Sequence, residues 1–141
     1  MLLEDITTSK FENDTFDIIT SSMVLNYLDD KNLSLVFDKF RLWLRNDGRL
    51  FYVIPHPVRM VYGDLTKYFS RGRSEGETPW GTMTIFHRRT VSDYINATIQ
   101  AGFTIELVDE PEVPERAEKD NPAQYKKYTS YPTRLVVKAK K

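Results

Sequence analysis

The stretch DTFDIITSS (residues 14–22) points most directly to the fold. Its β-branched and aromatic residues follow the turn-forming pair Asn13-Asp14 and predict a β-strand over residues 15–22. Because apolar and polar residues do not strictly alternate in it, we expect a strand that is buried on both faces. Beyond the segment LNYL (residues 25–28), apolar residues recur every three or four positions and predict a helix: Leu33, Val36, Phe37, Phe40 and Leu44.

The predicted helix has three candidate N-caps, namely Asp29, Asp30 and Asn32. Gly48 is suited to ending the helix through a left-handed backbone conformation. The stretch RLFYVI (residues 49–54) then predicts a second strand. The order strand, helix, strand implies a right-handed crossover between two parallel strands.

Regular patterns disappear between residues 56 and 89, where glycines, prolines, aromatics and charges are mixed. A connection of this length is usually functional or mobile, so we expect a lid or substrate loop with a short helix over residues 65–69. The remaining predicted elements are a helix from Thr90 with capping-box spacing to Asp93, a strand over 103–108, a loop over 110–121, a short helix from Pro122 and a strand over 133–139. The sequence therefore predicts a single α/β domain over residues 1–141.

The composition is that of a globular protein, with 40% hydrophobic and 28% charged residues. Lys+Arg and Asp+Glu both number 20, and this zero net charge argues against nucleic acid or a membrane surface as the main partner. The absence of cysteine excludes disulfides and thiolate chemistry. Since the sequence shows no signal-peptide pattern and no membrane-spanning apolar run, we expect a cytoplasmic protein.

The order of these motifs resembles that of class I S-adenosylmethionine-dependent methyltransferases, and of small-molecule methyltransferases in particular. DTFDIITSS is similar to the family's fourth strand, and LNYL to the segment after it. FRLWLRNDGRL (residues 40–50) resembles the family's helix-to-strand turn, with Asn-Asp-Gly in place of the usual Pro-Gly-Gly. Further matching positions are His56-Pro57, His87-Arg88, Ala101-Gly102-Phe103 and Glu110-Pro111.

The resemblance covers nearly the whole chain and implies a partial Rossmann-like methyltransferase sheet with flanking helices. Its strands would resemble strands 4 to 7 of the family's seven, with S-adenosylmethionine lying across their carboxyl ends. The glycine-rich turn that holds this cofactor in the family would precede residue 1. We therefore expect a truncated chain, the C-terminal part of the fold, that binds S-adenosylmethionine weakly by itself.

The resemblance also implies cofactor-binding residues. Asp5 and Ile6 match the position at which the family contacts adenine, and Ser21 and Ser22 lie where the methionine portion would bind. A turn-capping aspartate and strand-end serines bonded to neighbouring backbone would show the same pattern.

Candidates for catalysis and substrate binding are few. His56 and His87 are the only imidazoles and could accept a proton from the methyl acceptor. Without cysteine or a tight acidic cluster they make a poor metal site, so we expect no metal. Arg88 could bind an anionic substrate group, and Tyr62 and Trp80 could line a substrate pocket. Loop histidines, a solvated charge and aromatic anchors to the core are the structural alternatives.

The sequence thus predicts methyl transfer to a small molecule. One alternative is a non-enzymatic methyltransferase half that acts as an interaction module, and another is an α/β protein whose motifs match by chance. If the strand over residues 15–22 lacks a neighbour, its unpaired backbone favours a homodimer or pairing with a missing N-terminal half.

Overall fold

The computed structural model describes residues 3–78 and 81–141. A four-stranded sheet in the order β1-β2-β6-β5 lies at its centre. β1 (Phe16–Ser22) and β2 (Leu44–Pro55) are parallel, whereas β6 (Arg134–Lys140) is antiparallel to both β2 and β5 (Thr104–Asp109). The α/β class and the parallel pairing of the first two strands are confirmed.

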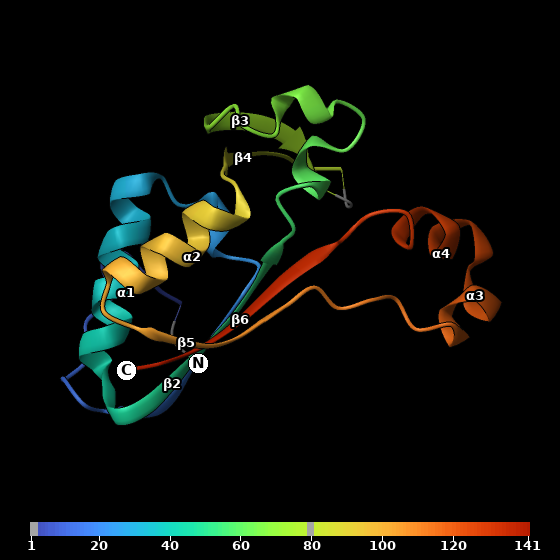
Figure 1. The fold of residues 1–141 in the computed structure, drawn as a ribbon. Coiled ribbons are helices and arrows are strands. Elements are labelled where there is room, and N and C mark those ends of the chain that lie inside the picture. Colours follow the sequence, from blue (N-terminus) through green and yellow to red (C-terminus); the bar gives the residue numbers. More distant parts are fainter. Residues whose placement is uncertain (1–2, 79–80) are drawn as a thin grey trace.

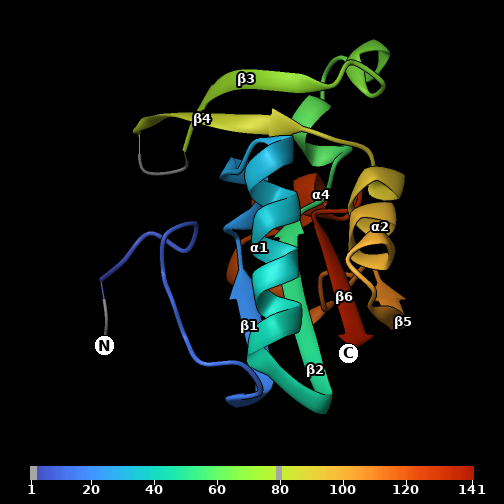
Figure 2. The ribbon, with the colours of Figure 1, turned by 90° about the vertical axis from the view of Figure 1, so that its left-hand side faces the viewer.

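Two helices, α1 (Asp30–Trp43) and α2 (Val91–Gln100), cover one face of this sheet (Figures 1 and 2). Within the described residues, no helix packs on the opposite face. Ile18 lies on that open face, opposite Arg49 in the register, and is 59% exposed. The prediction that this strand is buried on both faces is therefore wrong, because only its α1 side is covered.

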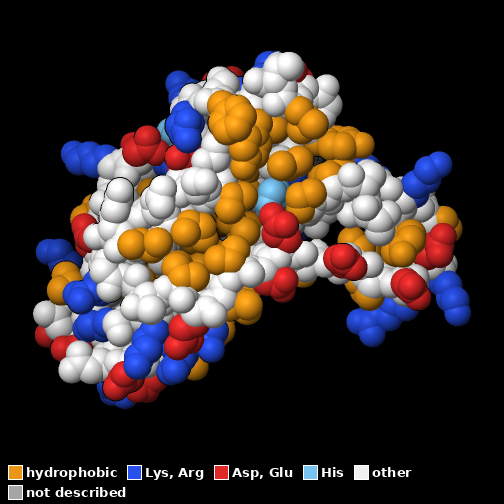
Figure 3. Space-filling model, viewed as in Figure 1, with side chains coloured by type: hydrophobic (Ala, Val, Ile, Leu, Met, Phe, Trp, Pro, Cys, Tyr) orange, Lys and Arg blue, Asp and Glu red, His pale blue; other side chains and the backbone are white. Residues whose placement is uncertain are grey.

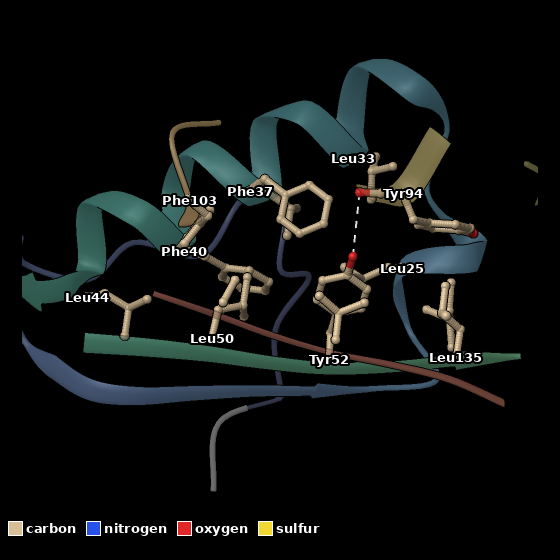
Figure 4. Packing of buried hydrophobic residues seen from close by; sticks show 14 of the residues in the cluster. Leu25, Leu33, Phe37, Phe40, Leu44, Leu50, Tyr52, Tyr94, Phe103 and Leu135 are labelled. Atoms are coloured by element: carbon tan, nitrogen blue, oxygen red, sulfur yellow. Dashed lines mark hydrogen bonds between the residues drawn. The ribbon is translucent and has the colours of Figure 1, made fainter. Parts of the chain in front are cut away.

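The core lies between α1 and the sheet (Figure 4). Leu33, Phe37 and Phe40 face Leu50 and Tyr52, so the three- to four-residue period of the helix meets the two-residue period of the strand. The buried Tyr52 hydroxyl lies 2.9 Å from the Thr98 hydroxyl and donates to the Tyr94 carbonyl at 3.5 Å. Burial raises the pKa of Tyr52 far above its ordinary value, so it stays protonated.

The N-terminus of α1 agrees with the sequence prediction, whereas its C-terminus differs in one respect. Asp29 is the N-cap of α1, since its carboxylate accepts from the Asn32 amide at 2.8 Å. The helix ends at Trp43, and the left-handed residue is Asp47, with φ of 64°, rather than Gly48. Gly48 is required for space, because an added Cβ would lie 2.8 Å from the Arg45 carbonyl oxygen.

Helix α2 begins and ends as predicted. Thr90 and Asp93 form a complete capping box, in which each side chain accepts from the other residue's backbone N–H. Gly102, with φ of 86°, ends the helix and leads into β5.

The segment over residues 56–89 is more regular than predicted. It contains two 3₁₀ turns, η2 (Arg59–Val61) and η3 (Leu65–Lys67), and a hairpin of β3 (Gly72–Glu77) and β4 (Met83–Arg88). This hairpin forms a separate two-stranded sheet above the helices (Figure 2). Only the short turn near residue 65 corresponds to an element that the sequence predicts.

Between β5 and β6 the chain forms a lobe of two short helices that stands beside the sheet (Figure 1). α4 (Pro122–Tyr128) starts at Pro122 as predicted, with Asn121 as its N-cap. α3 (Arg116–Asp120) falls in a stretch that we expected to be loop. In the described part of the chain, no helix is long and apolar enough to cross a bilayer.

Candidate functional site

The N-terminal segment runs beside the outer edge of β1 (Figure 2), and side chains of both line a groove. Its volume is about 620 Å³. All four residues that the family resemblance assigns to the cofactor line it, namely Asp5, Ile6, Ser21 and Ser22. Asp5 and Ile6 of the N-terminal segment and the two serines at the end of β1 are about fifteen positions apart in the sequence, and the fold brings them to one surface.

Asp5 supplies the carboxylate of the groove. One of its oxygens, Oδ1, accepts from the backbone N–H of Thr7 at 2.8 Å and from the Thr7 hydroxyl at 2.7 Å. The bond from the Thr7 hydroxyl is the main cause of a lowered pKa of Asp5, which is therefore ionised at neutral pH. In the described residues Oδ2 has no hydrogen-bond partner, so it can accept from a ligand while Oδ1 holds the turn.

Ser21 and Ser22 lie at the carboxyl end of β1, on opposite faces of the strand. Ser21 is buried on the core side opposite Tyr52, and Ser22 is exposed. The next residue, Met23, has φ of 59°, a left-handed conformation that costs a side-chain-bearing residue about 1–2 kcal/mol. Its N–H donates to the Val53 carbonyl at 2.8 Å, so the sharp turn is held by β2.

The apolar part of the groove is built from aromatic rings. The Phe11 ring packs edge-on against Phe16, at a centroid distance of 5.2 Å, and against Trp43 at 5.0 Å. Lys39 of α1 fixes the N-terminal segment, because its ammonium group donates to the carbonyls of Thr7 at 2.6 Å and Ser9 at 3.0 Å. Phe11 and Lys39 were not predicted as site residues, since their roles depend on packing between distant segments.

Asn26 lies in the LNYL segment just beyond β1. Its side chain is 4% exposed, and its Oδ1 has no hydrogen-bond partner among the described residues. A buried acceptor without a partner is costly, which marks this position as unusual. The sequence motif pointed to the segment but not to this residue.

His56 lies directly after β2 and is almost completely buried. Its Nδ1 accepts from the Val58 N–H at 3.1 Å, so Nε2 carries the proton and donates to Glu110 Oε1 at 2.6 Å. Burial lowers the pKa of His56, and the bond to Glu110 only partly offsets this. Both ring nitrogens are thus engaged within the protein, which weighs against a role as base, although that role stays a prediction.

The other candidates lie apart from the groove. His87 and Arg88 are on β4, where His87 pairs with Arg73 across the hairpin. The Arg88 guanidinium donates to the Ser70 hydroxyl at 3.3 Å. Tyr62 follows η2 and stacks on Tyr131, whereas Trp80 lies outside the described residues. The structure therefore brings the cofactor candidates together and leaves the catalytic and substrate candidates dispersed.

The hairpin is fastened to the helices at both ends by ion pairs. Arg71, just before β3, bonds both carboxylate oxygens of Asp93 at 2.8 and 3.0 Å. Arg89, just after β4, is buried and bonds Asp30 of α1 and the Leu28 carbonyl. Since Asp93 and Asp30 both lie in the first turn of a helix, the hairpin is held above the carboxyl ends of β1 and β2.

Comparisons with known proteins support this geometry. A family model described as a methyltransferase domain matches residues 1–52. A putative S-adenosylmethionine-dependent methyltransferase from Listeria monocytogenes superposes with a TM-score of 0.81, at 25% identity, over 98% of this chain and 67% of that one. The chain has the fold of the class I S-adenosylmethionine-dependent methyltransferases. Since 98% of this chain superposes on 67% of the Listeria protein, the four-stranded sheet corresponds to part of that protein's fold, in agreement with the partial sheet that the resemblance implies.

Two further matches agree with this methyltransferase fold. The S-adenosylmethionine-dependent methyltransferase from Mesorhizobium loti has a TM-score of 0.74 and 21% identity, over 98% of this chain and 68% of that one. An uncharacterised protein of Haemophilus influenzae is 26% identical over 144 residues, which are 89% of this chain and 54% of that protein. The chain therefore spans about half the length of the curated relative that it matches.

Proposed function

We propose that this chain takes part in methyl transfer from S-adenosylmethionine to a small molecule, with the groove beside β1 as part of the cofactor site. A single observation carries the proposal: the four residues assigned to the cofactor by sequence line the same groove. The methyltransferase fold supports the reaction class. The small-molecule acceptor follows from the sequence resemblance and from the hairpin, whose position above the strand ends suits a compact ligand.

The groove has the chemistry that an adenosine group requires. A planar ring needs apolar surface, which Ile6, Phe11 and Phe16 provide. An exocyclic amine needs an acceptor, and the free Oδ2 of the ionised Asp5 provides one. These residues therefore fit the nucleoside end of the cofactor, while the Ser21 and Ser22 hydroxyls could bind its polar chain.

When bound, the cofactor supplies a sulfonium methyl group that is already a strong electrophile. The protein then has to hold the acceptor in line and exclude water rather than form covalent bonds. The fastened hairpin can shield the strand ends, and His87 on β4 remains a candidate acceptor for the proton released.

The proposal is tested by NMR titration of the ¹⁵N-labelled chain with S-adenosylhomocysteine. We expect saturable shifts at Ile6, Ser21 and Ser22, and an affinity about tenfold lower in Asp5→Ala, the loss expected for one hydrogen bond to a charged group. Thr7→Val keeps the carboxylate but removes the hydroxyl that holds the turn, so it separates ligand binding from turn stability. Asp109→Ala, at an exposed end of β5, should leave the affinity unchanged. Shifts confined to residues outside the groove would overturn the proposal.

A further inference from the structure

Three cationic and three tyrosine side chains gather where β2 leaves the sheet and β6 enters it. They come from three separate stretches of the chain: the η2 turn, the end of α4 and the start of β6. Arg134, the first residue of β6, pairs with Pro55 at the end of β2. We call this group the arginine–tyrosine cluster, and it consists of Arg59, Tyr62, Lys127, Tyr128, Tyr131 and Arg134.

Ring contacts hold the cluster together. The Arg59 guanidinium carbon lies 5.6 Å from the centroid of the Tyr128 ring, and the Lys127 ammonium lies 5.8 Å from the same centroid. Tyr62 and Tyr131 are stacked, with centroids 3.9 Å apart and planes inclined by 27°. The facing surfaces of the stacked pair cover each other, but Tyr62 is 52% exposed and so leaves outer ring surface beside the positive charges.

Among the residues that the structure describes, the cationic side chains of the cluster form no direct ion pairs. In the described ranges 3–78 and 81–141, Arg59, Lys127 and Arg134 form no ion pair with a carboxylate, whereas Arg45, Arg49, Arg71, Arg73 and Arg89 all do. Arg134 bonds only the backbone carbonyl of Thr133, at 2.9 Å. Burial, and then repulsion from Arg59, lower the pKa of Arg134. Because like charges are held together here in a chain of zero net charge, an anion would be stabilised at this position.

We propose that the arginine–tyrosine cluster binds a small molecule that carries a carboxylate on a planar ring. Guanidinium groups match a carboxylate in both charge and geometry, and two of them are available in Arg59 and Arg134. The tyrosine faces match a planar apolar body. Neither feature alone selects this class of ligand, but their combination does.

The neighbouring cavity determines which end of the ligand faces the arginines. Between the α3–α4 lobe and the loop after β5 the surface is hollowed (Figure 3), and this cavity of about 490 Å³ reaches Tyr128 and Tyr131. Glu110, Glu112 and Glu115 also line it. Their negative charge makes the cavity less favourable for a carboxylate than the side of the cluster that carries Arg59 and Arg134.

The role of this ligand as methyl acceptor rests on the proposed function, whereas its binding does not. Ser22 pairs with Val53, and Arg134 pairs with Pro55. The cluster therefore lies at the same end of the strands as the carboxyl end of β1. β6 is two strands from β1, a separation of about 10 Å from strand spacing. A ligand that contacts Arg134 could therefore extend toward the carboxyl end of β1.

The test is an NMR titration of the chain, without cofactor, using benzoate as the probe. We expect benzoate to shift the resonances of Tyr62, Tyr131 and Arg134 and to bind about tenfold more weakly to Arg59→Gln and to Arg134→Gln. Arg73→Gln, on the exposed hairpin, is the matched control and should bind like the wild type.

Three ligand controls separate charge from ring shape. Benzyl alcohol lacks the charge, cyclohexanecarboxylate lacks the flat ring and inorganic phosphate lacks both the carboxylate and the ring, so all three should bind more weakly than benzoate. Absence of benzoate binding, equal binding of phosphate, or benzoate binding unaffected by both substitutions would overturn the proposal. If benzoate binds as expected while S-adenosylhomocysteine does not enter the groove, the ligand site at the cluster is supported and the proposed function is contradicted. If S-adenosylhomocysteine binds in the groove while benzoate does not bind, the proposed function is supported and the ligand site is contradicted.

Discussion

His56 links the ends of two strands through a single side chain. It follows β2, and Glu110, its partner at 2.6 Å, follows β5. The imidazole is buried, whereas the Glu110 carboxylate is about half exposed. The neutral ring is therefore favoured in the folded protein, and the pair fixes the start of the loop that leads to the α3–α4 lobe.

The stability of the protein should fall below neutral pH because of His56. Its folded-state pKa lies below the ordinary value of 6.5, so the unfolded chain binds the proton more readily. The stability that the neutral ring contributes is fully present above about pH 6.5 and is lost as the pH falls toward the folded-state pKa. Urea unfolding at pH 5 to 8 should show a dependence of up to about 1.4 kcal/mol per pH unit from this group.

Two variants isolate the His56 contribution. His56→Gln cannot titrate and should flatten the pH dependence, whatever its overall stability. Glu110→Gln removes the carboxylate but keeps the imidazole buried, so the dependence should persist. Equal slopes for the wild type and His56→Gln would show that other groups control acid stability.

For single residues, the sequence could predict roles that depend on neighbouring positions but not roles that depend on contacts between distant segments. Asp5, Ile6, Ser21 and Ser22 were predicted from the family resemblance of the segments around them, and the structure brings them to one groove, whereas their role in cofactor binding stays a prediction. The pairing of Lys39 with the Thr7 and Ser9 carbonyls was not predicted, since it joins residues about thirty positions apart. The arginine–tyrosine cluster was missed for the same reason, apart from Tyr62.

Among the elements, the β3–β4 hairpin departs most from the sequence pattern. The six residues of β3, GRSEGE, contain two glycines, two glutamates and no β-branched residue, so local propensity gives no indication of a strand. Its strand conformation depends on pairing with β4. By contrast, α1 and α2 carry both caps and periodic apolar faces, and the sequence predicted them correctly.

The hairpin should exchange its amide hydrogens faster than β2, because a two-stranded sheet has little stability of its own. Arg71→Gln removes the ion pair with Asp93 and should accelerate exchange in β3 and β4 about two- to fivefold, the effect expected for a surface ion pair. Exchange in β2 should not change. Arg71 is replaced rather than Asp93 because Asp93 also caps α2.

The matched control is Arg45→Gln, which removes a comparable exposed ion pair with Asp17 at the other end of the sheet. It should leave exchange in the hairpin unchanged. Protection of β3 and β4 equal to that of β2 would contradict the prediction that residues 56–89 act as a lid.

For the molecule as a whole, the sequence predicted which segments form the sheet but not how it is covered. The order of strands and helices followed from local patterns. The burial of β1 could not be predicted from local patterns, because it depends on what packs against the second face of the sheet. Within the described residues β1 pairs only with β2, and its other edge borders the groove.

We propose, as the sequence predicts, that two copies of the chain associate along β1 when the groove at that edge holds no cofactor, because Ile18 and the edge of β1 also line the groove. An unpaired strand edge favours pairing with another chain, and the exposed Ile18 adds apolar area. Light scattering should show a dimer, and Ile18→Lys should weaken it about tenfold or more, because a lysine would be buried without a partner.

The opposite edge of the sheet provides the control. Leu107 on β5 is 50% exposed, so Leu107→Lys makes a comparable change on the other edge strand. It should leave the dimer intact. A monomer at high concentration, or equal effects of the two substitutions, would show that β1 is not the interface.

The fastening of the hairpin has a consequence for how the protein can be varied. Both anchoring arginines, Arg71 and Arg89, lie outside the hairpin strands, and within β3 and β4 only Phe86 is buried. Most side chains of β3 and β4 therefore do not take part in core packing. Evolution or protein engineering can therefore replace the sequence of the hairpin between Arg71 and Arg89. Such a change would alter the surface that lies above the strand ends while the four-stranded sheet and its two helices stay the same.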